Sequence, residues 1–179
     1  DYVYLLNQDA YVYPDMFQLL IDEAEKIENQ KQYAIYSPLH VYRDGNSLDK
    51  QFKGYLKEVA TTIVEDCCLG VMKSIYSVDG VPAAGWLLPK RTLDSVGGFD
   101  PIFFHYGEDH HYIQRINYHG FKTGVVLKAK MIHDRDDFGN ASLAKKNMVF
   151  RSLKTEIFLN INLNKSERFR KLFKLFFLF

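Results

Sequence analysis

The chain has 179 residues, 47% of them hydrophobic, which is enough for one domain with a core of its own. Its formal net charge of +1 provides no overall field that would favour a nucleic acid as partner, and we expect none. The two cysteines are adjacent, at 67 and 68, so they cannot link distant parts of the chain, and we expect a reducing, cytoplasmic compartment.

The first half of the chain alternates strand-like and helix-like patterns. Residues 2–6, YVYLL, predict a buried strand, and residues 13–27 predict a helix with a proline in its first turn. Residues 33–42 predict a second strand, which Pro38 breaks or moves to the edge of the sheet. Residues 48–77 mix both patterns and predict no single element.

The second half contains five further segments with a recognisable pattern. They are a strand at 81–90, a short helix at 91–98, a helix at 107–120, one or two strands at 121–133 and a helix at 142–163. The helix at 107–120 has acids in its first turn, where they favour the helix dipole, and a glycine at its end. Strands interleaved with helices predict the α/β class.

The first candidate site directly follows the strand at 2–6, in the sequence LLNQDA. Open α/β sheets bind ligands at the carboxyl ends of strands, and a carboxylate such as Asp9 can hold a hard divalent cation there. The alternative is that Asn7 and Asp9 are turn residues that end the strand.

The second candidate site is the acidic pair Glu108 and Asp109 at the predicted helix start. A carboxylate presented at a helix N-terminus in a cleft can accept a proton from a substrate hydroxyl as general base. The alternative is that both acids are ordinary first-turn residues, although the glycines and aromatics before them are typical of a shaped loop.

Histidines suggest a third site. His133 follows a strand and could ligate a divalent metal, although a single histidine at a strand end is usually structural. His105, His110, His111 and His119 also raise the question of a zinc cluster. Neighbouring helical positions such as 110 and 111 diverge by about 100°, and 111 and 119 lack the i, i+4 spacing of helical zinc ligands. We therefore expect no zinc cluster.

Taken in order, these segments resemble a known family. YVYLLNQDAYVYPD at 2–15, the long block AAGWLLPKRTLDSVGGFDPIFFHYGEDHHYIQRINYHGFKTGVV at 83–126, and MIHD at 131–134 resemble the second half of a family-2 glycosyltransferase with a GT-A fold. The resemblance covers about half of the chain and is strongest to the rhamnosyltransferase-like branch of surface polysaccharide biosynthesis.

The resemblance implies roles for individual residues. Asp9 would bind the Mg²⁺ or Mn²⁺ ion that bridges the donor diphosphate, with Asn7 in the first position of the family's D-x-D-type motif. His133 would complete the metal site. Asp109 would be the general base that deprotonates the acceptor hydroxyl.

Acceptor binding is the second implied function. Trp86 would line the site of the acceptor and sugar, and Glu108 beside the base Asp109 could hydrogen-bond the acceptor. Where many family members have a further acid, this chain has His111, which changes the acceptor side of the site and leaves the base in place.

The resemblance also implies a division of the chain. Residues 1–139 would be the C-terminal part of a GT-A domain, and 140–179 a helical extension. The chain starts without methionine inside a strand-like run, and the nucleotide-binding half of the fold does not appear in it. We therefore expect a piece of a longer enzyme, inactive on its own.

The implied activity is metal-dependent, inverting transfer of a sugar from a nucleotide-diphospho-sugar to a saccharide or lipid-linked acceptor. Residues 165–179 alternate basic and aromatic side chains, so they could bind an anionic membrane on the inner face of the plasma membrane, or pack on the domain. Two further hypotheses remain open: a GT-A-derived binding module without catalysis, and an unrelated metal hydrolase.

Overall fold

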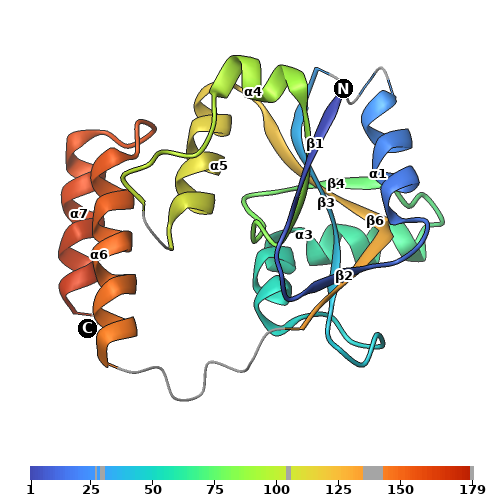
Figure 1. The fold of residues 1–179 in the computed structure, drawn as a ribbon, viewed down its shortest axis with the longest axis horizontal. Coiled ribbons are helices and arrows are strands. Elements are labelled where there is room, and N and C mark those ends of the chain that lie inside the picture. The colour runs from blue at the N-terminus through green and yellow to red at the C-terminus, as the bar shows by residue number, and fades with distance from the viewer. Residues whose placement is uncertain (27, 29–30, 104–105, 135–142, 178–179) are drawn as a thin grey trace.

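The structure is a computed structural model that describes residues 1–26, 28, 31–103, 106–134 and 143–177. In chain order its elements are β1 (Tyr2–Leu6), β2 (Ala10–Val12), α1 (Met16–Glu25), β3 (Tyr33–Val41), α3 (Lys50–Cys68), β4 (Ile75–Val78), β5 (Gly85–Pro89), α4 (Lys90–Val96), α5 (Glu108–Tyr118), β6 (Lys122–His133), α6 (Leu143–Leu159) and α7 (Lys165–Phe176). Figure 1 shows the strands as a central twisted sheet with helices around it. The α/β class is therefore confirmed.

The strands form one mixed sheet in the order β1-β5-β3-β6-β2, with β4 also paired to β6. β3 and β6 are parallel, and the other pairs are antiparallel. β6 is long enough to pair with two strands in addition to β3, since β4 pairs with its first half and β2 with its last residues, Met131–His133. This last pairing brings the segment after β1 to the end of β6.

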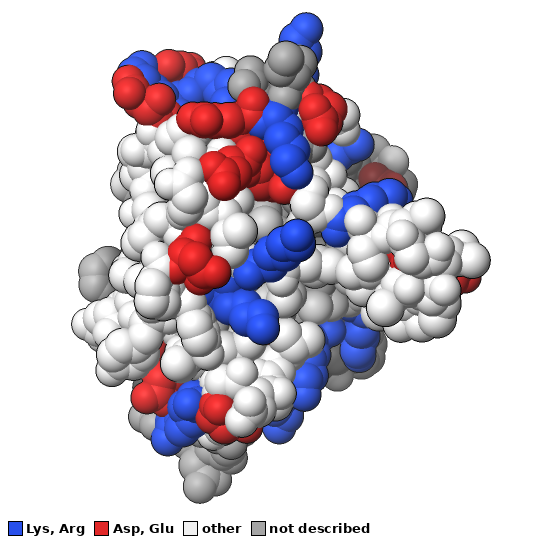
Figure 2. All heavy atoms as spheres, turned by 90° about the vertical axis from the view of Figure 1, so that its right-hand side faces the viewer, with Lys and Arg blue, Asp and Glu red and all other residues white. Residues whose placement is uncertain are grey.

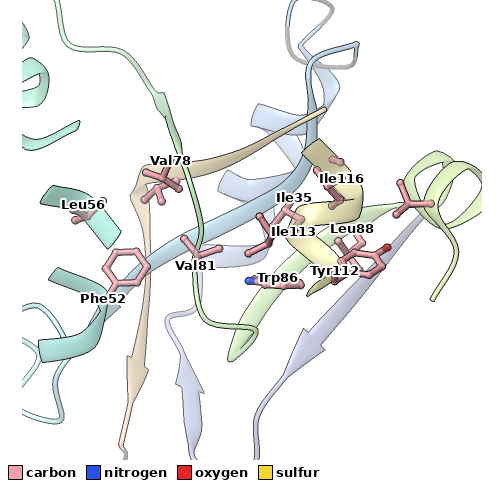
Figure 3. Close-up of a cluster of buried hydrophobic side chains, with 13 residues drawn as sticks. Ile35, Phe52, Leu56, Val78, Val81, Trp86, Leu88, Tyr112, Ile113 and Ile116 are labelled. Carbon is pink, nitrogen blue, oxygen red and sulfur yellow. The ribbon is translucent and has the colours of Figure 1, made fainter. Parts of the chain in front are cut away.

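Helices cover both faces of the sheet. On one face, α1 buries Met16, Leu20 and Ala24 against the strands. On the other face, α3, α4 and α5 pack on a second cluster, where Phe52 of α3 and Tyr112 of α5 are buried (Figure 3). All five residues of β5 are buried, because this strand lies between β1 and β3 with helices on both sides.

α6 and α7 form a helical pair beside α5, away from the sheet (Figure 1). Asn164 and Glu167 form a capping box that fixes the start of α7. In the described part of the chain, every helix is too short or too polar to cross a bilayer. The expected domain boundary, between residues 139 and 140, lies outside the described residues.

Two strand predictions need correction. The strand at 2–6 exists, but it is an edge strand with Val3 and Leu6 more than 40% exposed, because among the described strands it pairs with β5 alone. Pro38 neither breaks β3 nor moves it to an edge. It lies at a register shift in the β3–β6 pairing, where the missing N–H disturbs the ladder least.

Other segments differ from the sequence prediction in extent. Residues 48–77 contain α3, a 19-residue helix that begins at the N-cap Asp49, whose carboxylate accepts the Phe52 N–H, followed by the first part of β4. Residues 121–133 form a single strand. The three-residue β2 was not predicted, since its AYV sequence is too short for a periodic signal.

Charges of both signs are mixed on the molecular surface around α1. Figure 2 shows small groups in which Lys or Arg side chains lie close to Asp or Glu side chains, with uncharged surface between the groups. This distribution agrees with the net charge of +1.

Candidate functional site

A cavity of about 490 Å³ lies where the β1–β2 loop, the first turns of α3 and α5, the end of β6 and one side of α6 meet. Of the six site residues predicted from the sequence, five line this cavity: Asn7, Asp9, Glu108, Asp109 and His133. They come from three segments that are far apart in the sequence. The fold therefore brings the three candidate sites together into one.

Strand pairing places Asp9 beside His133. Ala10 of β2 is the register partner of His133, and the backbone N–H of Asp134 donates to the Asp9 carbonyl oxygen at 2.8 Å. The Asp9 Oδ1 atom consequently lies 3.6 Å from Nε2 of His133. The His133 side chain is 4% exposed and that of Asp9 is 40% exposed, so the carboxylate is the more accessible of these two lining groups.

These two side chains fit a divalent metal that shares its coordination with a substrate. A carboxylate oxygen and an imidazole nitrogen are suitable donors, and Mg²⁺ is commonly held by one or two carboxylates together with substrate phosphates and water. Among the described residues there is no group of three or more His, Cys, Asp or Glu that could enclose a metal.

Asp109 is presented by an unusual backbone turn at the start of α5. Tyr106 and Gly107 both have positive φ angles, 66° and 89°, immediately before the helix begins at Glu108. A Cβ on Gly107 would lie 3.2 Å from the Phe103 ring, so both the backbone angle and the space favour glycine. A non-glycine residue at positive φ is uncommon, and such strain is frequent at binding sites.

The two acids of this turn have different surroundings. The Asp109 Oδ1 atom accepts the backbone N–H of His110 at 2.8 Å. The Glu108 Oε2 atom is buried and has no hydrogen-bond partner among the described residues. A buried carboxylate oxygen without a donor is costly unless a ligand supplies one, so this atom is suited to receive a hydroxyl.

His110 lies in the same cavity and was considered at the sequence level only as a possible zinc ligand. Its Nε2 atom lies 2.8 Å from the Tyr55 hydroxyl oxygen, and its Nδ1 atom lies 3.4 Å from Oε2 of Glu156. The nearby Glu156 carboxylate raises the pKa of His110 to about 9, against the opposing effect of burial, and the charges of Asp109 and Glu108 act in the same direction. The cavity wall thus carries an imidazolium at neutral pH.

Sequence reasoning missed the contributions of α3 and α6. Gln51 and Tyr55 come from the segment that predicted no single element, and Ser152 and Glu156 come from the predicted C-terminal helix. For α3 the mixed pattern contained no usable signal. For α6 the signal was the single acid of a helix whose other charged residues are all basic, and it was not recognised.

Trp86 is the predicted site residue that does not line the cavity. It is fully buried in the core, with its ring stacked on that of Tyr112 at a centroid distance of 6.1 Å (Figure 3). The expectation that it contacts an acceptor therefore has no geometric support. Side chains alternate along β5, so Trp86 and Leu88 point to the face of the sheet that α3, α4 and α5 cover. Leu87 points to the face that α1 covers.

The other histidines of α5 are also outside the site. His111 is 6% exposed and packs on Phe103, and burial lowers its pKa, so it is a neutral core residue. His119 is the exposed C-cap of α5. His105 lies outside the described residues.

Comparison with known proteins supports the fold assignment. No protein-family model matches the chain, and no curated protein matches it. Among solved structures, the chain is similar to a crystal structure of GalNAc-T7 with UDP, GalNAc and Mn²⁺, with a TM-score of 0.54 and 14% sequence identity. The match covers 86% of this chain and 31% of GalNAc-T7, so the chain spans about a third of that protein. The likeness shows the fold alone: the chain has a fold of the GT-A glycosyltransferase type.

Proposed function

We propose that the chain is part of a metal-dependent, inverting glycosyltransferase that uses a nucleotide-diphospho-sugar donor. One observation carries this proposal: Asp9, His133 and Asp109, from three separate segments, line a single cavity in a GT-A-type fold. A carboxylate–imidazole pair and a second carboxylate at a helix start are the groups that such a transfer needs.

Asp9 and His133 would hold a divalent cation together with the diphosphate of the donor. The presence of UDP and Mn²⁺ in the GalNAc-T7 structure supports a donor and metal of this class. When bound, the metal would neutralise the charge that develops on the departing nucleotide diphosphate. Asn7, exposed on the β1–β2 loop, would contribute its amide to the same donor.

Asp109 would act as the general base. Its carboxylate would accept the proton of the acceptor hydroxyl while that oxygen forms a bond to the anomeric carbon and the bond from this carbon to the diphosphate oxygen breaks. Attack from the face opposite the leaving group inverts the anomeric configuration without an enzyme-bound intermediate. The unpartnered Oε2 of Glu108 would accept a second hydroxyl of the acceptor.

The finer assignment follows the sequence resemblance. We propose family 2, with a rhamnosyltransferase-like role in surface polysaccharide biosynthesis in the cytoplasm and a saccharide or lipid-linked acceptor. Residues 1–139 would belong to the GT-A domain and 140–179 would be a C-terminal extension. Because α6 lines the cavity, this extension would contribute to the site.

α7 would attach the enzyme to an anionic membrane surface. Phe169, Phe173 and Phe177 are 73%, 57% and 76% exposed and form a continuous row, with ring centroids 6.4 and 5.0 Å apart. Arg170 and Lys174, also exposed, lie one residue beyond the first two of these rings, on the adjoining side of the helix. An exposed aromatic row beside basic side chains suits the interface of an anionic bilayer.

Transfer assays on the protein at its full natural length, with a panel of nucleotide-sugars and Mn²⁺ or Mg²⁺, test the proposed function. We expect turnover of at least one donor, loss of turnover with EDTA, and loss with Asp109→Asn. Metal-dependent donor binding without turnover would instead identify a non-catalytic binding module. Absence of donor binding by the folded protein would overturn the proposal.

A further inference from the structure

The first turn of α5, which presents Asp109, is anchored to two other helices through one residue. The ring nitrogens of His110 contact the Tyr55 hydroxyl of α3 at 2.8 Å and the Glu156 carboxylate of α6 at 3.4 Å. The backbone N–H of the same His110 donates to Oδ1 of Asp109 at 2.8 Å. His110 therefore links the orientation of the Asp109 carboxylate to the positions of α3 and α6.

Glu156 is itself firmly held. Its side chain is 14% exposed, and its Oε1 atom accepts a hydrogen bond from Nε2 of Gln114 at 2.6 Å. The backbone carbonyl of Gln114 in turn accepts the side-chain N–H of Asn162 at 2.7 Å, in the segment between α6 and α7. One carboxylate thus contacts two successive turns of α5, at positions 110 and 114, which fixes the helix against α6.

We propose that His110 and Glu156 are positioning residues that hold the Asp109 carboxylate in one rotamer facing the cavity. This proposal rests on the proposed function, in which Asp109 accepts the proton of the acceptor. A general base must lie within hydrogen-bond reach of that proton, about 2.6–3.2 Å. A displacement of about 1 Å can cost about 100-fold in rate, so the anchoring of this turn has a direct effect on catalysis.

The charge state of His110 supports the arrangement. The charged and titratable groups that face it are Glu108 and Asp109 on α5, Glu156 on α6 and Tyr55 on α3. A neutral imidazole could donate from one ring nitrogen, whereas the imidazolium donates from both. With its pKa raised to about 9, His110 is positively charged at neutral pH, so it can donate to the Tyr55 hydroxyl and form an ion pair with the Glu156 carboxylate, 3.4 Å away, at the same time.

The experiment measures the side-chain rotamer of Asp109 by NMR, from its Hα–Hβ couplings, in the wild-type chain and in three variants. They are His110→Gln, Glu156→Gln and, as matched control, His119→Gln at the exposed end of the same helix. No variant removes the backbone N–H that Asp109 accepts, so a change in the couplings reports loss of anchoring. Amide exchange of the sheet strands, measured on the same samples, establishes that each variant is folded.

We expect the couplings of a single rotamer in the wild type and in His119→Gln, and averaged couplings in His110→Gln and Glu156→Gln. In Glu156→Gln the pKa of His110, followed by ring NMR, should fall from about 9 towards 6.5. A single Asp109 rotamer in both anchor variants would overturn the proposal. These readouts need no substrate, so they decide the positioning role whether or not the protein transfers sugar. In an active enzyme, both anchor variants should lower kcat about tenfold or more and leave the donor KM unchanged.

Discussion

The carboxylate of Asp9 and the imidazole of His133 lie 3.6 Å apart, although Asp9 precedes the second strand and His133 ends the sixth. The pairing of Ala10 with His133 produces this distance, because the short β2 strand returns the chain to the end of β6. The relationship depends on a sheet register, so a shift of one residue in this pairing would separate the two side chains.

Removal of either side chain should weaken metal binding. We expect Asp9→Ala and His133→Ala each to lower the Mn²⁺ affinity at least tenfold, because each removes one of the two proposed protein ligands. Electron paramagnetic resonance of free Mn²⁺, measured with and without a nucleoside diphosphate, gives the affinity. Asp94→Ala is the matched control, since Asp94 is an exposed acid of α4 paired with Lys90, outside the cavity. Equal Mn²⁺ binding by all three variants would contradict the assignment.

Asp109→Asn should abolish transfer without loss of donor binding. The amide keeps the shape of the carboxylate but cannot accept the acceptor proton, and general base catalysis contributes about 10²–10⁴-fold in rate. We expect kcat to fall by that factor while the donor dissociation constant changes less than about twofold. The neighbouring Glu108→Gln should raise the acceptor KM and retain most of kcat. If Glu108→Gln were the more damaging change in kcat, the roles of the two acids would be reversed.

Sequence reasoning named candidate residues in three separate segments, and the structure places five of the six around one cavity. Asp9, Asp109 and His133 each follow or begin an element with a clear local pattern, so they could be recognised. The contributions of Tyr55 and Glu156 depend on how α3 and α6 pack around α5, and local periodicity contains no information about that packing. Trp86 was misplaced for the same reason: its position in β5 was predictable, but the face to which it points was not.

The stability of the protein should depend on pH through His110. Its pKa is raised to about 9, above the ordinary value of 6.5, so the folded state binds this proton more tightly than the unfolded state. The stabilisation is fully present below pH 6.5 and is lost as the pH rises through about 9. We expect His110→Gln to be less stable than the wild type at pH 6, with the difference shrinking by pH 10. Urea unfolding at both pH values measures the free energy of unfolding of the wild type and of His110→Gln. If the difference between the two proteins were the same at pH 6 and pH 10, the charge of His110 would not contribute to stability.

Membrane attachment should depend on both sides of the exposed face of α7. We expect the wild type to co-sediment with anionic vesicles. The double variant Phe169→Ser, Phe173→Ser should lose this binding, because the aromatic side chains insert into the bilayer interface. The double variant Arg170→Glu, Lys174→Glu should bind more weakly, because the attraction to the anionic lipids is removed. Zwitterionic vesicles provide the comparison, and sedimentation equilibrium of the free protein tests self-association. Equal binding to both kinds of vesicle would contradict the proposed attraction to anionic lipids. A dimer of the free protein that the phenylalanine variant does not form would assign this face to self-association instead of membrane binding.

Two glycine substitutions should change stability in opposite directions. A Cβ on Gly124 in β6 would lie 2.4 Å from the Ile75 Cδ1 atom and 2.8 Å from the Tyr33 ring, closer than packed atoms allow. Gly124→Ala should therefore destabilise the fold by about 1–3 kcal/mol through overpacking. Gly54 lies on the exposed side of α3, and a Cβ added there would meet no described atom within 4 Å, so Gly54→Ala should stabilise by about 0.5–1 kcal/mol through helix propensity. Urea midpoints of the two variants, measured against the wild type, test both signs at once. Stabilisation by Gly124→Ala would show that β4 and β3 can move away from β6, and that the close contact at this position is not required by the fold.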